Sequence, residues 1–294
     1  MKNILLSTLL SSLLLSSGLY AKSNIKSVAE VNHTAVAKGT HNALTHQKKL
    51  IKEAIQSLQY TNNALIALSK NDKKSAQSNI EKALGKLEVI LSAKNAPKLL
   101  PIDSNIAMVE FVGTKKDVEN SLDTVEDLLK HNKVQVARTL LNSLQSEIDV
   151  TVVSLPLVTY PDALKLAAKY LHENKIANAK SVLEVALSTF DKTTTVIPLP
   201  LLKATDLINV SATLSKSGKK EEALKYLKAA QDQLDVAQAL GYVSHSSTTY
   251  KAMHKAIQNV RKEIKGKNKA EKLFDELKNE LKDFKAKIFS EKAK

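Results

Sequence analysis

Residues 171–190 have the sequence Leu-His-Glu-Asn-Lys-Ile-Ala-Asn-Ala-Lys-Ser-Val-Leu-Glu-Val-Ala-Leu-Ser-Thr-Phe. A polar turn that ends at Asn174 follows one apolar segment and precedes another. In the second segment, four apolar residues follow steps of 4, 3 and 4, which places them on one face of a helix. They are Ala179, Leu183, Ala186 and Phe190. The stretch therefore predicts a helical hairpin, in which the small alanine lets the two helices approach closely.

The same pattern occurs three more times along the chain. Each copy has a short polar turn after an apolar helix, followed by the same spacing of apolar residues. The turns are Leu68-Ser-Lys-Asn71, Leu129-Lys-His-Asn132 and Leu214-Ser-Lys-Ser-Gly218. The apolar positions are Ala76, Ile80, Ala83 and Leu87; Ala137, Leu141, Leu144 and Ile148; and Ala223, Leu227, Ala230 and Leu234. We therefore expect a mainly α-helical protein made of repeated helical hairpins.

The spacing of the hairpins favours a repeat architecture. The first alanines of the four patterns lie 61, 42 and 44 residues apart, which is the scale of helical repeats that stack their hairpins. Tetratricopeptide-like proteins form a concave binding face in this way. The tetratricopeptide consensus itself is absent, because its Trp, Leu-Gly and Tyr signature is missing and the period here is longer. The alternative is ordinary helical packing with a coincident period.

Three stretches between the hairpins differ in composition, because β-branched residues or prolines are frequent in them. They are residues 106–112, 150–157 and 193–201. β-branched residues favour an extended backbone, and Pro156, Pro198 and Pro200 exclude helix interiors around them. The sequence therefore predicts short strands or extended connectors, with room for one small sheet beside the helices. Pro161 stands where a helix can begin, since its missing N–H is not needed in a first turn.

The C-terminal part carries two further apolar seams at helical spacing. The first consists of Tyr250, Met253, Ile257, Val260 and Ile264, and the second of Ala270, Phe274, Leu277, Leu281, Phe284 and Ile288. We expect an amphipathic helical extension over residues 266–294. Three interpretations fit it: a coiled-coil or docking helix, a helix on a membrane surface through residues 270–289, or a helix that folds back on its own domain.

The composition supports a helical fold and excludes several kinds of chemistry. The 294 residues include only 7 Gly and 6 Pro, too few turn formers for a many-stranded β-sandwich or barrel. Without Cys, the chain has no disulfide, no thiolate metal site and no cysteine nucleophile. The net charge is +14, but Arg138 and Arg261 are the only arginines. Because nucleic-acid recognition relies on the bidentate fork of arginine, nucleic acid is not an expected partner.

Residues 1–21 have the features of a secretory signal peptide. Lys2 gives the positive start, residues 4–15 form a short apolar run, and residues 19–21 suit a cleavage site. We expect a mature chain that begins at Lys22 and resides in the periplasm, where a protein without cysteine has nothing to oxidise. An uncleaved N-terminal anchor is the alternative.

No catalytic or cofactor motif is present in the sequence. It has no Gly-x-Ser-x-Gly elbow, no phosphate-binding glycine loop and no His-Glu-x-x-His pair. His41 and His46 lie five residues apart, so on a helix they point about 140° apart and do not share a ligand face. We therefore expect no enzymatic activity, no metal site and no cofactor.

Histidines and tyrosines remain as candidates for function. His131 and His172 occupy matching turn positions in two hairpins. They are candidate pH sensors, because histidine gains its charge between about pH 5 and 8; the alternative is a plain polar turn residue. Five tyrosines, each with apolar area and a polar tip, suit either a binding surface or a core position. They are Tyr160, Tyr170, Tyr226, Tyr242 and Tyr250.

Three strings of residues stand out from the helical pattern. They are Ser-Leu-Pro-Leu-Val-Thr-Tyr-Pro-Asp-Ala at 154–163, Val-Ile-Pro-Leu-Pro-Leu at 196–201 and Gln-Leu-Asp-Val-Ala-Gln-Ala-Leu-Gly-Tyr at 233–242. With Glu-Lys-Ala-Leu-Gly-Lys-Leu at 81–87, they resemble the signature of the YfdX family of exported bacterial proteins, over roughly residues 43–264. The resemblance marks as structural motif positions Leu155, Pro156, Leu157, Tyr160, Pro161, Pro198, Leu199, Pro200, Gly241 and Tyr242.

The resemblance implies a mainly helical periplasmic protein that self-associates and is linked with envelope and acid stress. It implies no assigned enzymatic activity and no cofactor. It divides the mature chain into an N-terminal segment at 22–42, a YfdX-like domain at 43–265 and a C-terminal extension at 266–294.

We therefore expect a non-catalytic, stress-associated protein that binds client proteins or small ligands and changes its assembly with pH. Acidification would add up to seven histidine charges to a surface that is already basic, and the repulsion would loosen an oligomer. The alternative is a helical-repeat adaptor that docks to an envelope partner through its C-terminal helix. The expected partners are a second copy of the chain, client proteins or small ligands.

Overall fold

The computed structural model describes residues 25–45, 51–243, 248–266 and 270–291. Over these residues the helices are α1 (Val28–Thr45), α2 (Lys52–Ser69), α3 (Lys73–Leu91), α4 (Lys115–Lys130), α5 (Val134–Ser143), α6 (Tyr160–His172), α7 (Ile176–Ala186), α8 (Leu199–Lys216), α9 (Lys220–Ala239), α10 (Thr248–Lys265) and α11 (Ala270–Glu291). The strands are β1 (Leu99–Val109), β2 (Glu147–Pro156) and β3 (Asp191–Pro198). The predicted signal peptide and His46 lie outside the described residues, so both stay predictions.

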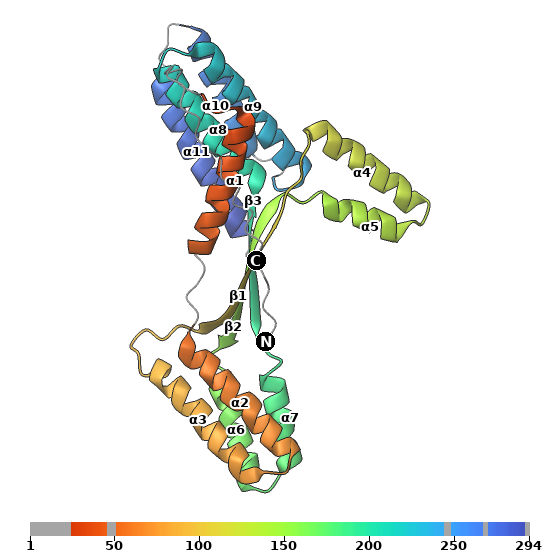
Figure 1. The fold of residues 1–294 in the computed structure, drawn as a ribbon, viewed down its shortest axis with the longest axis vertical. Helices are drawn as coiled ribbons and strands as arrows, with labels where there is room; N and C mark the ends of the chain where they lie inside the picture. The colour runs from red at the N-terminus through yellow and green to blue at the C-terminus, as the bar shows by residue number, and fades with distance from the viewer. Residues whose placement is uncertain (1–24, 46–50, 244–247, 267–269, 292–294) are drawn as a thin grey trace, which may run out of the picture.

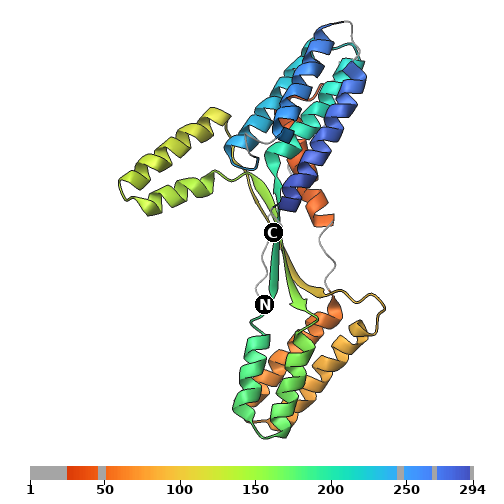
Figure 2. The same ribbon diagram turned by 180° about the vertical axis from the view of Figure 1, so that it is seen from behind.

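The molecule is elongated, with a helical bundle at each end of a three-stranded sheet (Figure 1). The lower bundle consists of α2, α3, α6 and α7, and the upper bundle of α1, α8, α9, α10 and α11. The hairpin of α4 and α5, which we call the arm, projects sideways near the junction of the sheet and the upper bundle, as the view from behind also shows (Figure 2). The chain is therefore mainly helical with a small sheet, as predicted.

The four predicted hairpins are confirmed as α2–α3, α4–α5, α6–α7 and α8–α9. Their turns share one residue with positive φ, namely Asn71 at 57°, Asn132 at 55°, Asn174 at 59° and Gly218 at 75°. Gly and Asn enter this left-handed region at the lowest steric cost. The four turns thus have a common geometry that the sequence already indicated.

The hairpins do not stack in sequence order, so the interpretation as a stacked repeat with a concave face does not hold. The first and third hairpins pack on each other in the lower bundle, the fourth belongs to the upper bundle, and the second forms the arm. A strand between consecutive hairpins carries the chain along the molecule each time. This separates hairpins that are neighbours in sequence.

Two of the predicted helix faces end earlier than expected. Helix α5 ends at Ser143, so Ile148 lies in β2, and α7 ends at Ala186, before Phe190. Ile148 is fully buried, but it is a residue of strand β2 and not of a helix. The apolar spacing continued in phase past the helix end because the strand that follows also buries apolar side chains.

The predicted extended stretches form one antiparallel sheet in the order β1-β2-β3. Val150 at its centre lies opposite Ile106 on one side and Thr195 on the other. Strand β1 begins at Leu99, earlier than the sequence predicted, and its register shifts once between Pro101 and Asp103. A shift of this kind lets one strand accommodate an extra residue.

The prolines mark where strands give way to helices. Strand β3 ends at Pro198, so the extended stretch predicted to reach Leu201 is too long, and α8 begins at Leu199. Pro200 lies in the first turn of α8 and Pro161 in the first turn of α6, where neither removes a helix hydrogen bond. Their placement in first turns confirms the prediction for Pro161.

Each bundle has its own core, built from the predicted apolar positions. In the lower bundle Ile80, Leu87 and Leu183 are fully buried, and in the upper bundle Leu227 and Leu234 are. The alanines of the pattern are buried with them, which permits close helix packing. A third, smaller cluster packs α1 and the start of α8 on the upper end of the sheet.

The C-terminal helix folds back on its own chain, which is one of the three interpretations of its sequence. Ala270, Phe274, Leu277 and Leu281 are buried in the upper core, against α10 and α8. These four side chains are therefore not available to a membrane or to a docking partner while α11 keeps this place. Helix α1, from the predicted segment 22–42, packs in the same bundle. None of the helices in the described ranges combines the length and apolar character needed to cross a membrane.

Candidate functional site

A groove of about 510 Å³ lies between α6 and α7, next to the point where β2 enters the lower bundle. Most of its surface is apolar. Its lining residues are Pro156, Thr159, Tyr160, Asp162, Ala163, Leu166, Ser181, Val182, Val185, Ala186 and Thr189. The groove therefore contains two of the predicted motif positions.

The local sequence explains how the groove is built. Strand β2 ends at Pro156, and α6 begins at Tyr160 with Pro161 in its first turn. The tyrosine side chain is buried, and this burial raises the pKa of its hydroxyl to about 12, against a smaller opposing effect of the Thr61 hydroxyl. The neutral phenol ring thus forms part of an apolar wall at the start of the helix.

Two large aliphatic side chains of the groove lining are exposed to solvent. Leu166 on α6 is 40% exposed and Val185 on α7 is 60% exposed. Large aliphatic side chains with this exposure on both sides of a groove present apolar surface to solvent. The polar groups of the lining are Thr159, Asp162 and a few hydroxyls. The arrangement suits an apolar or amphipathic ligand and contains no catalytic constellation.

The other motif positions lie at both ends of the sheet. Leu155 and Leu157 are buried in the lower core, at the lower end of β2. Pro198, Leu199 and Pro200 are buried at the upper end, where β3 meets α8.

The last string ends beside the same upper junction. Gly241 has a φ of 79° just after α9, and Tyr242 follows it. The Tyr242 hydroxyl accepts a hydrogen bond of 2.8 Å from the Ser146 N–H, while the Ser146 carbonyl accepts one of 2.8 Å from the Leu199 N–H. Ser146 thus joins two of the strings, so the motif residues hold the strands to the bundles.

The two candidate pH sensors are exposed, and neither of them lines the groove. His131 caps the end of α4, with its Nδ1 2.8 Å from the Asp127 carbonyl oxygen and 3.5 Å from the Asp127 carboxylate. His172 is the last residue of α6. The structure does not bring the two together.

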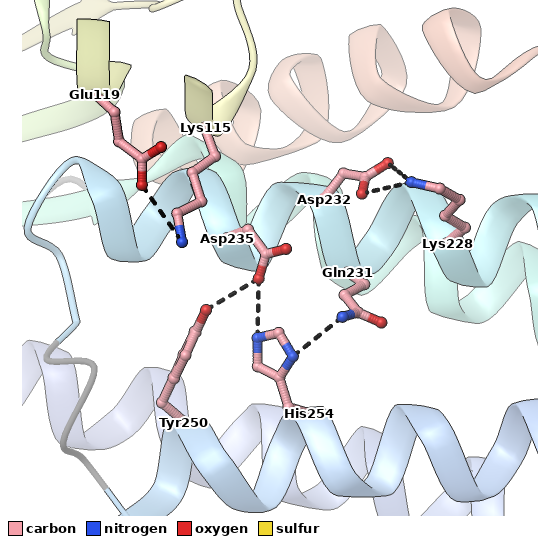
Figure 3. A network of polar contacts seen from close by, with 8 residues as sticks. All are labelled: Lys115, Glu119, Lys228, Gln231, Asp232, Asp235, Tyr250 and His254. Atoms are coloured by element: carbon pink, nitrogen blue, oxygen red, sulfur yellow. Dashed lines mark hydrogen bonds and ion pairs between the residues drawn. The ribbon is translucent and has the colours of Figure 1, made fainter. Parts of the chain in front are cut away.

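A third histidine, which the sequence did not single out, lies in a polar cluster between α9 and α10 (Figure 3). His254 Nε2 is 2.9 Å from Asp235 Oδ1, and His254 Nδ1 is 3.2 Å from the Gln231 amide nitrogen. The Tyr250 hydroxyl donates to the same Asp235 oxygen at 3.0 Å. Both ring nitrogens of His254 are therefore engaged.

The cluster shifts the titration of its members. Burial alone would raise the pKa of the Asp235 carboxyl, but hydrogen bonds from His254 and Tyr250, with the charges of His254 and Lys115, outweigh it and hold the pKa below its usual range. Burial and the neighbouring carboxylate raise the pKa of Tyr250. Asp235 is thus a carboxylate at neutral pH and Tyr250 a neutral donor.

A cavity of about 510 Å³ opens beside this cluster. Lys115, Lys251 and Lys255 line it with Asp235, Tyr250, His254 and Gln258. Lys115 comes from the first turn of α4, so this is where the arm meets the upper bundle. The i, i+4 spacing of Tyr250 and His254 was the one sequence signal for the cluster; their rings meet edge to face at 4.5 Å.

Of the two interpretations of the five tyrosines, the structure favours core positions over a binding surface. Tyr160, Tyr226, Tyr242 and Tyr250 are buried. Tyr170 is partly buried, with the Lys175 ammonium 5.9 Å from its ring centre. Within the described parts of the chain, no group of three or more His, Asp or Glu side chains is placed to hold a metal ion.

Comparison with known proteins gives one family. The family model of the YfdX protein matches residues 57–196. No curated protein gave a match. A solved structure of Salmonella Typhi YfdX aligns at 15% identity over 51% of this chain and 93% of its own, with a TM-score of 0.36. So loose a superposition says little about shared three-dimensional arrangement.

The matched residues hold almost all of the sheet and the first three hairpins, including the groove between α6 and α7. The strings at 196–201 and 233–242 lie almost wholly beyond the match. The resemblance to the YfdX family is thus confirmed over residues 57–196.

Proposed function

We propose that this protein is a non-catalytic, periplasmic, stress-associated protein that binds apolar segments of client proteins, or small apolar ligands, in the groove between α6 and α7. The observation that carries the proposal is the groove itself, about 510 Å³ in volume and lined mainly by apolar side chains. Such concave apolar surfaces are the usual binding sites for apolar ligands. The family match supports the choice of this groove, because the groove lies within the matched residues.

The proposal assigns no catalytic residue. The best candidate for a catalytic residue would be His254, but Asp235 and Gln231 engage both of its ring nitrogens. A general base needs a free ring nitrogen within reach of a substrate proton. The cluster therefore supports a structural role better than a chemical one.

Two substitutions on opposite walls of the groove test the proposal. In the mature chain, Leu166→Asp with Val185→Asp places charges where a client would bury apolar surface. We expect binding of an apolar dye to weaken by at least about tenfold, with a similar loss of protection against heat-induced aggregation of a model client. Circular dichroism checks that helicity is retained.

A matched control separates the groove from apolar surface in general. Ile66 and Val89 are 53% and 62% exposed on α2 and α3 of the same bundle. Ile66→Asp with Val89→Asp adds the same charges away from the groove and should leave both readouts unchanged. If this control loses binding as strongly as the groove variant, the groove is not the site.

The second element of the proposal is assembly that changes with pH through His131 and His172. Both side chains are exposed, and His131 lies against the carboxylate of Asp127. Light scattering of the chain from Lys22 at about pH 7.5 and pH 5 brackets the histidine transition. We expect a reversible change of mass at constant helicity, reduced in His131→Gln with His172→Gln. An unchanged mass would remove this element and leave the groove hypothesis standing.

A further inference from the structure

The four hairpins share a sequence pattern, so equivalent positions can be compared directly. Counting from the turn, Leu129 at the end of α4 corresponds to Leu68, Leu171 and Leu214, which are 3%, 0% and 7% exposed. Leu129 is 47% exposed. The same apolar position is therefore buried in three hairpins and open in the arm.

The second helix of each hairpin gives the same result. Leu141 on α5 corresponds to Ile80, Leu183 and Leu227, and each of these three is fully buried. Leu141 is 42% exposed. Another helical hairpin or a helix of the upper bundle covers the equivalent positions elsewhere, whereas the arm contacts α9 through α4 and projects away from both bundles (Figures 1 and 2).

Each helix of the arm carries one regular seam of four apolar residues, and two residues of each seam are exposed. On α4 the seam is Val118, Leu122, Val125 and Leu129; along α5 and its C-cap residue it is Val134, Ala137, Leu141 and Leu144. Alternate members are buried: Val118, Val125, Ala137 and Leu144. The others are 39–54% exposed: Leu122, Leu129, Val134 and Leu141.

The exposed halves of both seams open to the same side of the arm. With 100° of rotation per residue, the exposed pair lies about 40° around the helix axis from the buried pair on α4, and about 60° on α5. When each helix is viewed from its N-terminus to its C-terminus, the two rotations have the same direction. Since the two helices run antiparallel, rotation in the same sense brings both pairs to one side. The arm thus presents a continuous apolar strip, two side chains from each helix.

The lower bundle shows what covers such a strip in this chain. There, one hairpin seats on another with exchanged helices, so that α2 lies against α7 and α3 against α6. The arm is suited to the same arrangement by charge as well. Helix α4 carries five carboxylates against three lysines, while α5 carries Arg138 and no carboxylate, with Lys133 just before it. Exchanged helices would place the acidic α4 of one hairpin on the basic α5 of the other.

We propose that the arm is an assembly element, which packs on the arm of a second copy of this chain to form a four-helix bundle with α4 on the partner's α5. A two-fold axis makes such an interface self-complementary, and it buries the four exposed seam residues at once. The inference is independent of the groove, because it concerns a different hairpin.

The first test is the solution mass of the mature chain at neutral pH. We expect the chain to have at least twice the mass of one copy, and Leu122→Glu with Leu141→Glu to reduce that mass by half. Both residues are already exposed, so helicity should be retained. The control is Ile66→Glu with Val89→Glu, which adds the same charges at similarly exposed positions of the lower bundle and should leave the mass unchanged.

The second test uses the absence of cysteine from the chain. Single cysteines are introduced in turn at Leu122, Leu129, Val134 and Leu141, and mild oxidation should link two copies through at least one of these positions. Val89→Cys on α3 is the control and should give no linked copies. A single-copy mass at every concentration, or an assembly that survives the glutamate variant and forms no disulfide through the arm, overturns the proposal.

Discussion

The arm and the α6–α7 hairpin are built from one pattern and end in different surroundings. Their turns match closely: Asn132 and Asn174 have φ values of 55° and 59°, and the next residue in each donates to a carbonyl five positions back at 2.8 Å. Yet Leu141 is 42% exposed and Leu183 is fully buried. Local sequence thus determines the hairpin, whereas burial depends on what packs on it.

The arm compensates with local interactions at its helix ends. Helix α4 begins with a capping box, in which Thr114 and Asp117 satisfy each other's backbone N–H groups. Glu126 and Lys130 pair at 2.7 Å one turn apart on its exposed surface. Helix α6 has no side-chain cap, and neither has α5 of the arm, so the difference between the hairpins is confined to α4. A cap contributes about 1 kcal/mol and an exposed ion pair less than about 1 kcal/mol, so these interactions do not replace a closed core.

The largest expected difference between the two hairpins is the effect of removing a leucine. Leu183→Ala should lower the free energy of unfolding of the lower bundle by about 2–5 kcal/mol, because it leaves a cavity in a closed core. Leu141→Ala should cost less than about 1 kcal/mol in the isolated copy, since much of that side chain is already in water. Denaturant unfolding followed by circular dichroism measures both. Equal losses would mean that the arm has a closed core of its own.

A smaller effect is expected at the cluster of Asp235, Tyr250 and His254, which lies where the arm meets the upper bundle. Asp235→Asn removes the charge that His254 and Tyr250 bind, and should cost about 1–3 kcal/mol at pH 7. Because the folded pKa of Asp235 lies below its unfolded value, its contribution is present above about pH 4 and is lost as the pH falls through the lower folded pKa. The difference between the two proteins should therefore shrink at about pH 3.

The neighbouring Asp232→Asn is the control for that measurement. Asp232 pairs with Lys228 on the same helix, but its side chain is 55% exposed. We expect its loss to change the free energy of unfolding by less than about 0.5 kcal/mol at either pH. If the two variants behave alike, the cluster does not contribute through its half-buried charge.

The smallest expected effect is at the turns, and it should be similar in both hairpins. Asn132→Ala and Asn174→Ala each put alanine at a positive φ, at a cost of about 1 kcal/mol. Asn174→Ala also removes an exposed hydrogen bond of 2.6 Å from the Lys73 ammonium, which should add less than about 1 kcal/mol. Hydrogen exchange of the amides in each hairpin reports the local change. A clearly larger loss in the arm would show that its turn, and not its missing cover, distinguishes it.

The hairpins were predictable because their signals are local. A polar turn with Asn or Gly and an apolar spacing of 4 and 3 residues act within about twenty residues, and the turns at Asn71 and Gly218 follow from them. The same spacing gave a wrong prediction for Ile148, which it placed on a helix, because periodicity alone does not show where a helix ends. The strands followed from β-branched composition, but the start of β1 at Leu99 did not, because residues 103–105 are polar.

The candidate sites were less accessible to sequence reasoning. Pro156 and Tyr160 were identified, but the groove also needs Val182 and Val185 from the next helix. Asp235 and His254 are 19 residues apart on different helices, and only packing brings them to 2.9 Å. Likewise, the exposure of Leu129 and Leu141 depends on which hairpins meet. That choice is made by the three strands, whose course along the molecule no local pattern encodes.

The sheet between the bundles also has a mechanical consequence. Its strands run from one bundle to the other, and the hydrogen bonds of an antiparallel ladder lie across the strands (Figure 1). Strand β3 leads directly from α7 of the lower bundle to α8 of the upper bundle, so a pull that separates the bundles acts along the covalent backbone of a strand that is already extended. Bending of the molecule between the bundles is opposed only by this one thin sheet. The sheet is thus a tether of nearly fixed length, which resists stretching far more than it resists flexing.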